Sequence, residues 1–190
     1  MPQDFNWVKY QPLFYYKPQA YTFSCFSACL QMALVNFGIL APVGRHIEDQ
    51  FNNYMTDNLH QHNLDDAAPT LEQVQTFMLG PNFLGRERLT LLNYIENIND
   101  DAFETIQRLL QHQHNIALIG AIRDQGGHAV AIVKCKGFVV AINPGDFPDN
   151  YIVIGLNDIV PYHLDGHIAA IGCEARGWAI MDYCYIISNR

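Results

Sequence analysis

The chain has 190 residues, of which 49% are hydrophobic and 16% charged, and this composition indicates one globular domain over residues 1–190 rather than a disordered chain. Nineteen acidic residues against eleven basic ones give a net charge of −8, which argues against a nucleic-acid partner and against docking on an anionic membrane surface. No apolar run has the length of a membrane span, and the start lacks the apolar core of a Sec signal peptide, so we expect a cytoplasmic protein or one exported without such a signal.

The cysteine content predicts free thiols rather than a disulfide framework. The five cysteines are odd in number and unevenly spaced. Without a signal peptide, reduced thiols are the default state. One of these thiols is therefore a candidate nucleophile.

The first quarter of the chain predicts an extended segment followed by a buried helix. The first 24 residues are rich in aromatic residues and prolines, which is typical of a segment lying on the body of a domain. Residues 25–37 are apolar on almost every side, interrupted only by Ser27, Gln31 and Asn36. A helix that is apolar all round is a buried helix, and Gly38 provides its C-terminal stop.

Three more helices follow in the pattern. Residues 43–55 predict an amphipathic helix with an apolar residue at every fourth position: Val43, Ile47, Phe51 and Met55. Residues 56–69 predict a polar loop, and Thr70 with Gln73 forms a capping box before an apolar face of Leu71, Val74, Phe77 and Met78. Residues 80–100 have no clear period, and residues 101–113 are again helical.

The second half of the chain changes to short β-branched runs separated by turn residues. These predict strands at 116–122, 128–135, 138–143, 151–156 and 178–187, with turns at 124–127 and 136–137. Helices first and strands later, without βαβ alternation, indicate an α+β fold with an antiparallel sheet.

Cys25 stands at the predicted start of the buried helix. There the helix dipole and the backbone N–H groups of the first turn stabilise a thiolate, so Cys25 is the candidate nucleophile. The alternative interpretation is that Cys25 is one more small apolar core residue, as free cysteines usually are. We assign that interpretation to the other four cysteines: Cys29, Cys135, Cys173 and Cys184.

His128 and Asn143 are predicted to meet across a hairpin. His128 opens a strand directly after Gly126-Gly127, and Asn143 ends the next strand before Pro144. A turn centred near residue 136 pairs position 128 with about 143 or 144, and an amide beside an imidazole fixes its tautomer and orientation. The alternatives are a solvated histidine at a strand end and ordinary Asn-Pro turn chemistry.

The order Cys, His, Asn resembles that of papain-like cysteine peptidases. The segment from Gln19 to Cys25, with an aromatic and small residues after it, is similar to the family's Gln–five residues–Cys motif. Gly-Gly-His128 and Ile-Asn143-Pro144 resemble its His and Asn strands. The resemblance covers roughly residues 10–156 and is greatest to compact bacterial branches, namely double-glycine bacteriocin-processing peptidases and effector proteases. Two positions depart from those branches: Phe26 follows the cysteine, and Asn-Pro stands where Asp-Pro is usual.

The resemblance implies a role for each residue. Cys25 would attack a carbonyl as a thiolate, His128 would carry the proton, Asn143 would hold the ring, and the Gln19 amide would contribute to the oxyanion hole. Asp146 is the alternative third member. The implied activity is cleavage of a peptide bond in a protein or peptide substrate, with the protein a secreted bacterial effector. Glutamine deamidation or transglutamination on the same scaffold, and a catalytically inactive binding domain, remain alternatives.

No cofactor or metal is expected from the sequence. The pairs His60/His62 and His112/His114 have no cysteine or carboxylate at a recognised ligand spacing. A glycine-rich phosphate loop is absent as well, so nucleotide binding has no support.

Overall fold

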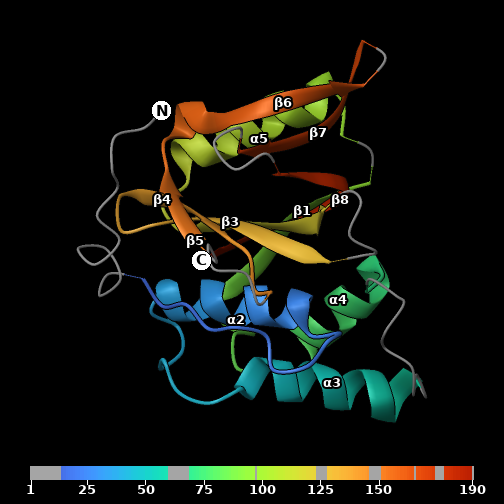
Figure 1. Ribbon diagram of the computed structural model, residues 1–190. Helices are drawn as coiled ribbons and strands as arrows, with labels where there is room; N and C mark the ends of the chain where they lie inside the picture. Colours follow the sequence, from blue (N-terminus) through green and yellow to red (C-terminus); the bar gives the residue numbers. More distant parts are fainter. Residues whose placement is uncertain are drawn as a thin grey trace.

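The computed structural model describes residues 14–59, 69–96, 98–122, 128–145, 151–164, 166–173 and 178–189. Its helices are α2 (Cys25–Asn36), α3 (His46–Leu59), α4 (Leu71–Leu79) and α5 (Asp100–His112). They lie on both sides of an antiparallel sheet, which is the predicted α+β class. In Figure 1, α2 lies directly under the sheet with α3 beneath it, and α5 lies above the sheet beside β6 and β7. Within the described ranges, no helix has the length and apolar character to cross a bilayer.

Helix α2 is the buried helix that its composition predicts. All of its residues are buried, including Asn36, whose side-chain amide exchanges hydrogen bonds with the backbone of Tyr15. The helix ends at Asn36 with Phe37 as its C-cap, and Gly38 follows with a φ of 74°. Gly38 N–H donates to Val35 and Ile39 N–H donates to Leu34, the two bonds of a Schellman motif. The predicted glycine stop is therefore confirmed.

The other helices agree with their predicted patterns except that α3 begins later and ends later than predicted, at Leu59, so residues 56–59 of the predicted loop are helical. The capping box of Thr70 and Gln73 is present at α4. Helix α3 begins at His46, so Val43 lies outside it and is 59% exposed, which makes its assignment to the apolar face wrong. The remaining predicted positions of that face are buried, since a helix packed against a neighbour buries only the stripe that contacts it.

The sheet has eight strands, and seven of them follow the order β5-β4-β3-β2-β8-β7-β6, while β1 pairs with β8 off this path. All pairs are antiparallel. The strands are β1 (Leu89–Ile95), β2 (Ile116–Ile122), β3 (Ala129–Cys135), β4 (Phe138–Ile142), β5 (Tyr151–Ile154), β6 (Ile159–Leu164), β7 (His167–Cys173) and β8 (Trp178–Asn189).

Three of these strands were not predicted, and each has a local cause. Strand β1 contains a register shift between Leu91 and Asn93, so its side chains do not alternate with period 2. Strand β6 contains Pro161, which a central strand excludes but which is tolerated at the end of the sheet order, where β6 lies. Strand β7 pairs with β6 and is too rich in small residues to stand out.

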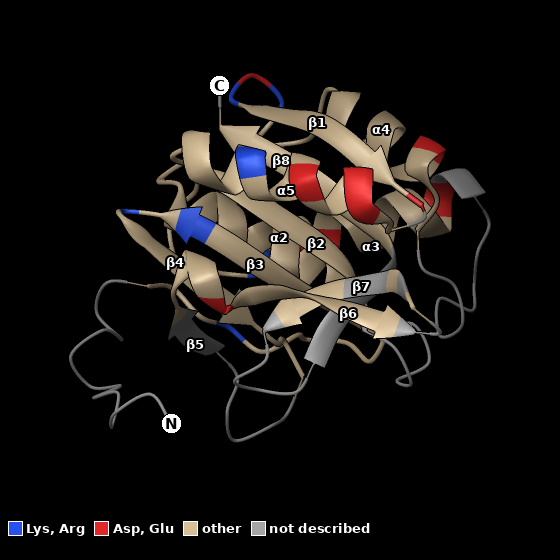
Figure 2. Cartoon of the chain, turned by 90° about the horizontal axis from the view of Figure 1, so that it is seen from above, with Lys and Arg blue, Asp and Glu red and all other residues tan. Residues whose placement is uncertain are grey.

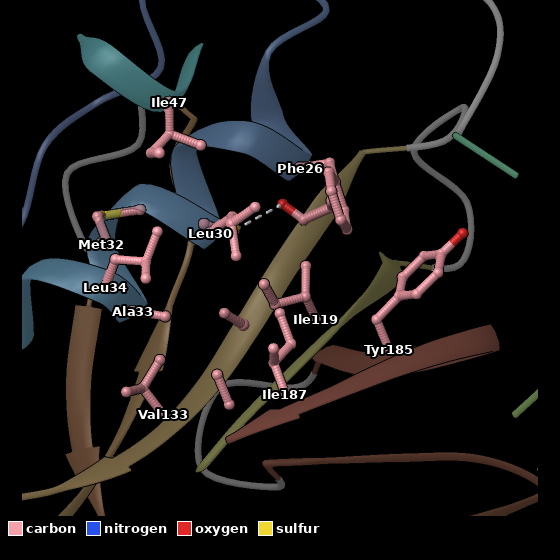
Figure 3. Close-up of a cluster of buried hydrophobic side chains, with 14 of the residues drawn as sticks. Phe26, Leu30, Met32, Ala33, Leu34, Ile47, Ile119, Val133, Tyr185 and Ile187 are labelled. Atoms are coloured by element: carbon pink, nitrogen blue, oxygen red, sulfur yellow. Dashed lines mark hydrogen bonds between the residues drawn. The ribbon is translucent and has the colours of Figure 1, made fainter. Parts of the chain in front are cut away.

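The sheet is buried on both faces, which explains the nearly continuous apolar runs of β2, β3 and β4. Figure 3 shows Leu30 and Ala33 of α2 pointing toward Ile119, Val133 and Ile187 of the sheet. On the other face, a second cluster joins α5 to the alternate residues of the same strands and to β6 and β7. This two-sided core anchors the start of α2 and the ends of β3 and β4.

Charges are sparse on the outer surface of this core. Figure 2 shows acidic residues on α5. Asp100, Asp101 and Glu104 of this helix are exposed, as is Arg108 further along it. The acidic residues of the first turn suit the positive end of the helix dipole.

Candidate active site

Cys25 is the first residue of α2, and its sulfur faces the start of β3. The sulfur accepts a hydrogen bond from the backbone of Ala129, the residue that follows His128. Cys29, one turn further along α2, donates its Sγ–H to the Ala129 carbonyl at 3.7 Å. The start of α2 is thus packed against the end of β3 at which His128 lies.

The pKa of Cys25 corrects one expectation. Burial raises the pKa of the Cys25 thiol, and hydrogen bonds from the backbone of Ala129, Phe26 and Cys25 itself offset part of that rise. The sequence predicts a lowered pKa from the helix terminus alone, because burial is not visible in a one-dimensional pattern. Burial thus favours the neutral thiol over the thiolate at this position.

The other described cysteines fit the interpretation that they are small apolar core residues. Cys29, Cys135 and Cys184 are fully buried. Burial raises the pKa of Cys135 to about 11 and that of Cys184 to about 12, and it raises the pKa of Cys29 well above its usual value. The side chain of Cys173 lies outside the described part of the chain.

His128 and Asn143 form the predicted pair. His128 Nε2 lies 2.7 Å from Asn143 Oδ1, and Gly145 N–H donates to the same oxygen at 2.9 Å. Because a backbone N–H can only donate, the atom facing it must be the amide oxygen, and His128 Nε2 must then carry a proton. In the neutral ring this leaves Nδ1 as the basic nitrogen.

The pairing of β3 and β4 brings His128 and Asn143 together, although the register differs slightly from the predicted one. A two-residue turn joins the strands, with φ of 52° at Lys136 and 80° at Gly137, as hairpins of this kind require. Ala131 pairs with Ile142, so a continued ladder would set position 128 opposite 145 rather than 143 or 144. Asn143 therefore reaches the ring from a neighbouring position, beside Gly145.

The loop after β4 is packed closely around the imidazole. A Cβ on Gly145 would lie 3.2 Å from Asn143 Oδ1 and 3.4 Å from His128 Nε2, which is tighter than ordinary contact. The hydroxyl of Tyr16 donates to the Asn143 carbonyl at 3.2 Å. Asn143 is thus held through its side chain and its backbone at once.

Gln19 lies on the segment that precedes Cys25 and contacts the Asn143 loop. Its backbone N–H donates to the Pro144 carbonyl at 2.9 Å. Its amide nitrogen donates to the carbonyls of Tyr21 at 2.9 Å and Thr22 at 3.0 Å, while Oε1 is buried without a hydrogen-bond partner. In this conformation the amide N–H groups point to the backbone, so an oxyanion role for Gln19 requires one of them to turn toward the substrate.

Glu48 of α3 is a functional candidate that the pattern did not single out. Its side chain is fully buried and accepts hydrogen bonds from Lys17, Ala20 and Ser24, all in the segment before Cys25. Its spacing to Phe51, three residues on, places it beside the apolar stripe of α3. An acidic residue within an apolar stripe is the signal that would have marked it.

Several predicted positions lie outside the described residues: Asp146, Gly126-Gly127, and the pair His60 and His62. Within the described ranges, no group of three or more His, Cys, Asp and Glu residues is placed to hold a metal ion.

The chain was also compared with known proteins. No protein-family model matches it, and no curated protein matches it by sequence. Function therefore has to be argued from the geometry of Cys25, His128 and Asn143.

Proposed function

We propose that the protein is a thiol hydrolase that cleaves a peptide bond through an acyl-enzyme, with Cys25, His128 and Asn143 as its catalytic residues. The observation that carries the proposal is the shared Asn143 oxygen, which accepts from both His128 Nε2 and Gly145 N–H. It orients the ring so that Nδ1 is the base, and the neighbouring residue Ala129 contacts the Cys25 sulfur.

The chemistry follows from these contacts. The Cys25 proton passes to His128 Nδ1 as the sulfur attacks the substrate carbonyl carbon, and the imidazolium keeps its Nε2–H bond to Asn143. His128 then gives the proton to the leaving amine, and a thioester remains on Cys25. Water, losing its proton to the same nitrogen, releases the acid and restores the thiol.

The arrangement of helix and sheet supports this choice over an unrelated thiol function. The buried helix that begins with the cysteine packs on an antiparallel sheet whose adjacent strands bear histidine and asparagine at their ends. The same thioester chemistry serves glutamine deamidation when the carbonyl belongs to a side-chain amide, so the two reactions share every residue named above.

The test compares wild type with Cys25→Ala on a library of proteome-derived peptides. We expect new N-termini, detected by terminal labelling and mass spectrometry, only with the wild type. Conversion of glutamine to glutamate without new N-termini would identify the protein as a glutamine deamidase instead of a peptidase. Absence of both products, together with no thioester on Cys25 from an activated ester, would refute the hydrolase.

A further inference from the structure

Glu48 is a buried carboxylate, and its side-chain hydrogen-bond partners in the described ranges belong to one short segment, residues 17–24. Lys17 Nζ donates to Oε1, while Ala20 N–H and the Ser24 hydroxyl donate to Oε2 at 2.7 Å and 2.6 Å. A buried carboxylate is unfavourable unless donors surround it, and here three donors do so. The contact therefore links α3 firmly to the segment before the nucleophile.

This segment contains no helix or strand, only a turn in which Ser24 N–H donates to the Tyr21 carbonyl at 3.1 Å. Glu48 holds it at Ala20, which adjoins Gln19, and at Ser24, which adjoins Cys25. Those two neighbours carry the donors that would face the oxygen of a reacting carbonyl. Movement of the segment would displace such donors relative to the sulfur, and displacements of about 1 Å in a site can cost on the order of 100-fold in rate.

Ser24 shows what the contact changes locally. A serine at the N-cap normally accepts a hydrogen bond from the first turn of its helix. Ser24 is the N-cap of α2 and makes no such bond, since its hydroxyl contacts Glu48 and the backbone of Tyr21 instead. Glu48 thus draws the N-cap side chain away from the helix terminus at which the chemistry is proposed.

We propose that Glu48 is a positioning residue for the oxyanion side of the site, acting through residues 19–25. This inference rests on the proposed function. It requires Glu48 to matter for steps that pass through a tetrahedral oxyanion and to matter little for reactions of the Cys25 sulfur that form none.

The substitution Glu48→Gln tests this with almost no change of volume. All three partners are donors toward Glu48, whereas an amide offers one oxygen and one NH2 group. Whichever way the amide turns, its NH2 faces either the Lys17 ammonium or the Ala20 N–H. Asp49→Asn is the matched control, because Asp49 is the next residue of α3, is partly exposed, and contacts the same segment through the Tyr21 hydroxyl at 3.0 Å.

Two reaction rates of Cys25, measured in the full-length protein, distinguish a positioning role of Glu48 from a purely structural one. Acylation of Cys25 by p-nitrophenyl acetate passes through an oxyanion, and alkylation by iodoacetamide does not. We expect Glu48→Gln to slow acylation on the order of 10- to 100-fold, the range for loss or displacement of an oxyanion donor, while alkylation stays within about twofold. Asp49→Asn should leave both rates within about twofold of wild type.

Ser24→Ala provides a second variant that keeps the charges of Lys17 and Glu48 and removes the contacts of the Ser24 hydroxyl with Glu48 and the Tyr21 backbone. It should show the same selective loss of acylation, of smaller size, even if Glu48→Gln does not fold. Equal slowing of acylation and alkylation in these variants would reduce Glu48 to a structural role and overturn the inference, while the hydrolase proposal would stand. A wild type that forms no acyl-enzyme would instead overturn the proposed function, and this inference with it.

Discussion

Replacing Asn143 provides the sharpest test of how the imidazole is held. Asn143→Ala removes the oxygen that accepts from His128 Nε2 and Gly145 N–H, and Asn143→Asp keeps an acceptor there and adds a negative charge. Each lost hydrogen bond is worth about 0.5–1.5 kcal/mol of stability, so Asn143→Ala should lower the free energy of unfolding by about 1–3 kcal/mol.

The effect on rate comes from the bond to His128 alone. That bond strengthens by about 1 kcal/mol when the ring becomes charged, and a factor of ten in rate corresponds to about 1.4 kcal/mol. Loss of the fixed tautomer and orientation adds to this, so acylation should slow on the order of 10- to 100-fold. With Asn143→Asp, activity should persist, because the carboxylate keeps a hydrogen-bond acceptor for His128 Nε2–H.

Three measurements check this reasoning. Acylation is followed with p-nitrophenyl acetate, unfolding with denaturant, and the tautomer of His128 with 15N NMR, which should find the proton on Nε2. The control is Asn99→Ala, which removes the N-cap bond to Ala102 N–H and should cost about 1 kcal/mol of stability with no change in acylation. Acylation by Asn143→Ala within twofold of wild type, or a proton on Nδ1 in the neutral wild type, would refute the reasoning.

Three further predictions follow from burial and close packing. Because burial raises the pKa of Cys25, its alkylation by iodoacetamide should accelerate about tenfold per unit between pH 6 and 8, and a flat profile would indicate a preformed thiolate instead. The pKa of Cys184 is raised to about 12 in the folded protein, so its stabilising contribution is complete below the unfolded value of about 8.5 and is lost as pH rises toward 12. In this pH range the free energy of unfolding of Cys184→Ala should therefore fall less steeply than that of the wild type, by about 1.4 kcal/mol per pH unit. Parallel curves of stability against pH for the two proteins would contradict this. Gly145→Ala should slow acylation on the order of tenfold by crowding Asn143, whereas Gly137→Ala, at a φ of 80°, should lower stability by about 1 kcal/mol and leave acylation unchanged; equal losses of acylation would count against the crowding.

The parts of the fold that the pattern predicts are those in which neighbours along the chain supply the decisive contacts. Helix α2 ends just before Gly38 because the positive φ of this glycine and two backbone hydrogen bonds close the helix locally. The β3–β4 hairpin likewise depends on its own turn at Lys136 and Gly137, which places His128 near Asn143 to within one or two residues. Such features need no knowledge of distant segments.

Strand β1 and the edge strand β6 required the tertiary structure. A bulge in β1 and a proline in β6 erase the local pattern, and only pairing with β8 and β7 makes these segments strands. Their partner strands lie far away in sequence or are themselves weakly patterned. Local propensity therefore could not predict these two strands.

The candidate site likewise has features that the sequence predicts and features that depend on the tertiary structure. Residue types, spacing and the family resemblance predicted Cys25, His128 and Asn143 as a set, and the β3–β4 hairpin explains the contact between His128 and Asn143. Only the tertiary structure decided that burial raises the pKa of Cys25 and that Glu48 is enclosed by donors from residues 17–24. Burial and desolvation are properties of everything packed around a group, and sequence order does not contain them until the chain is folded.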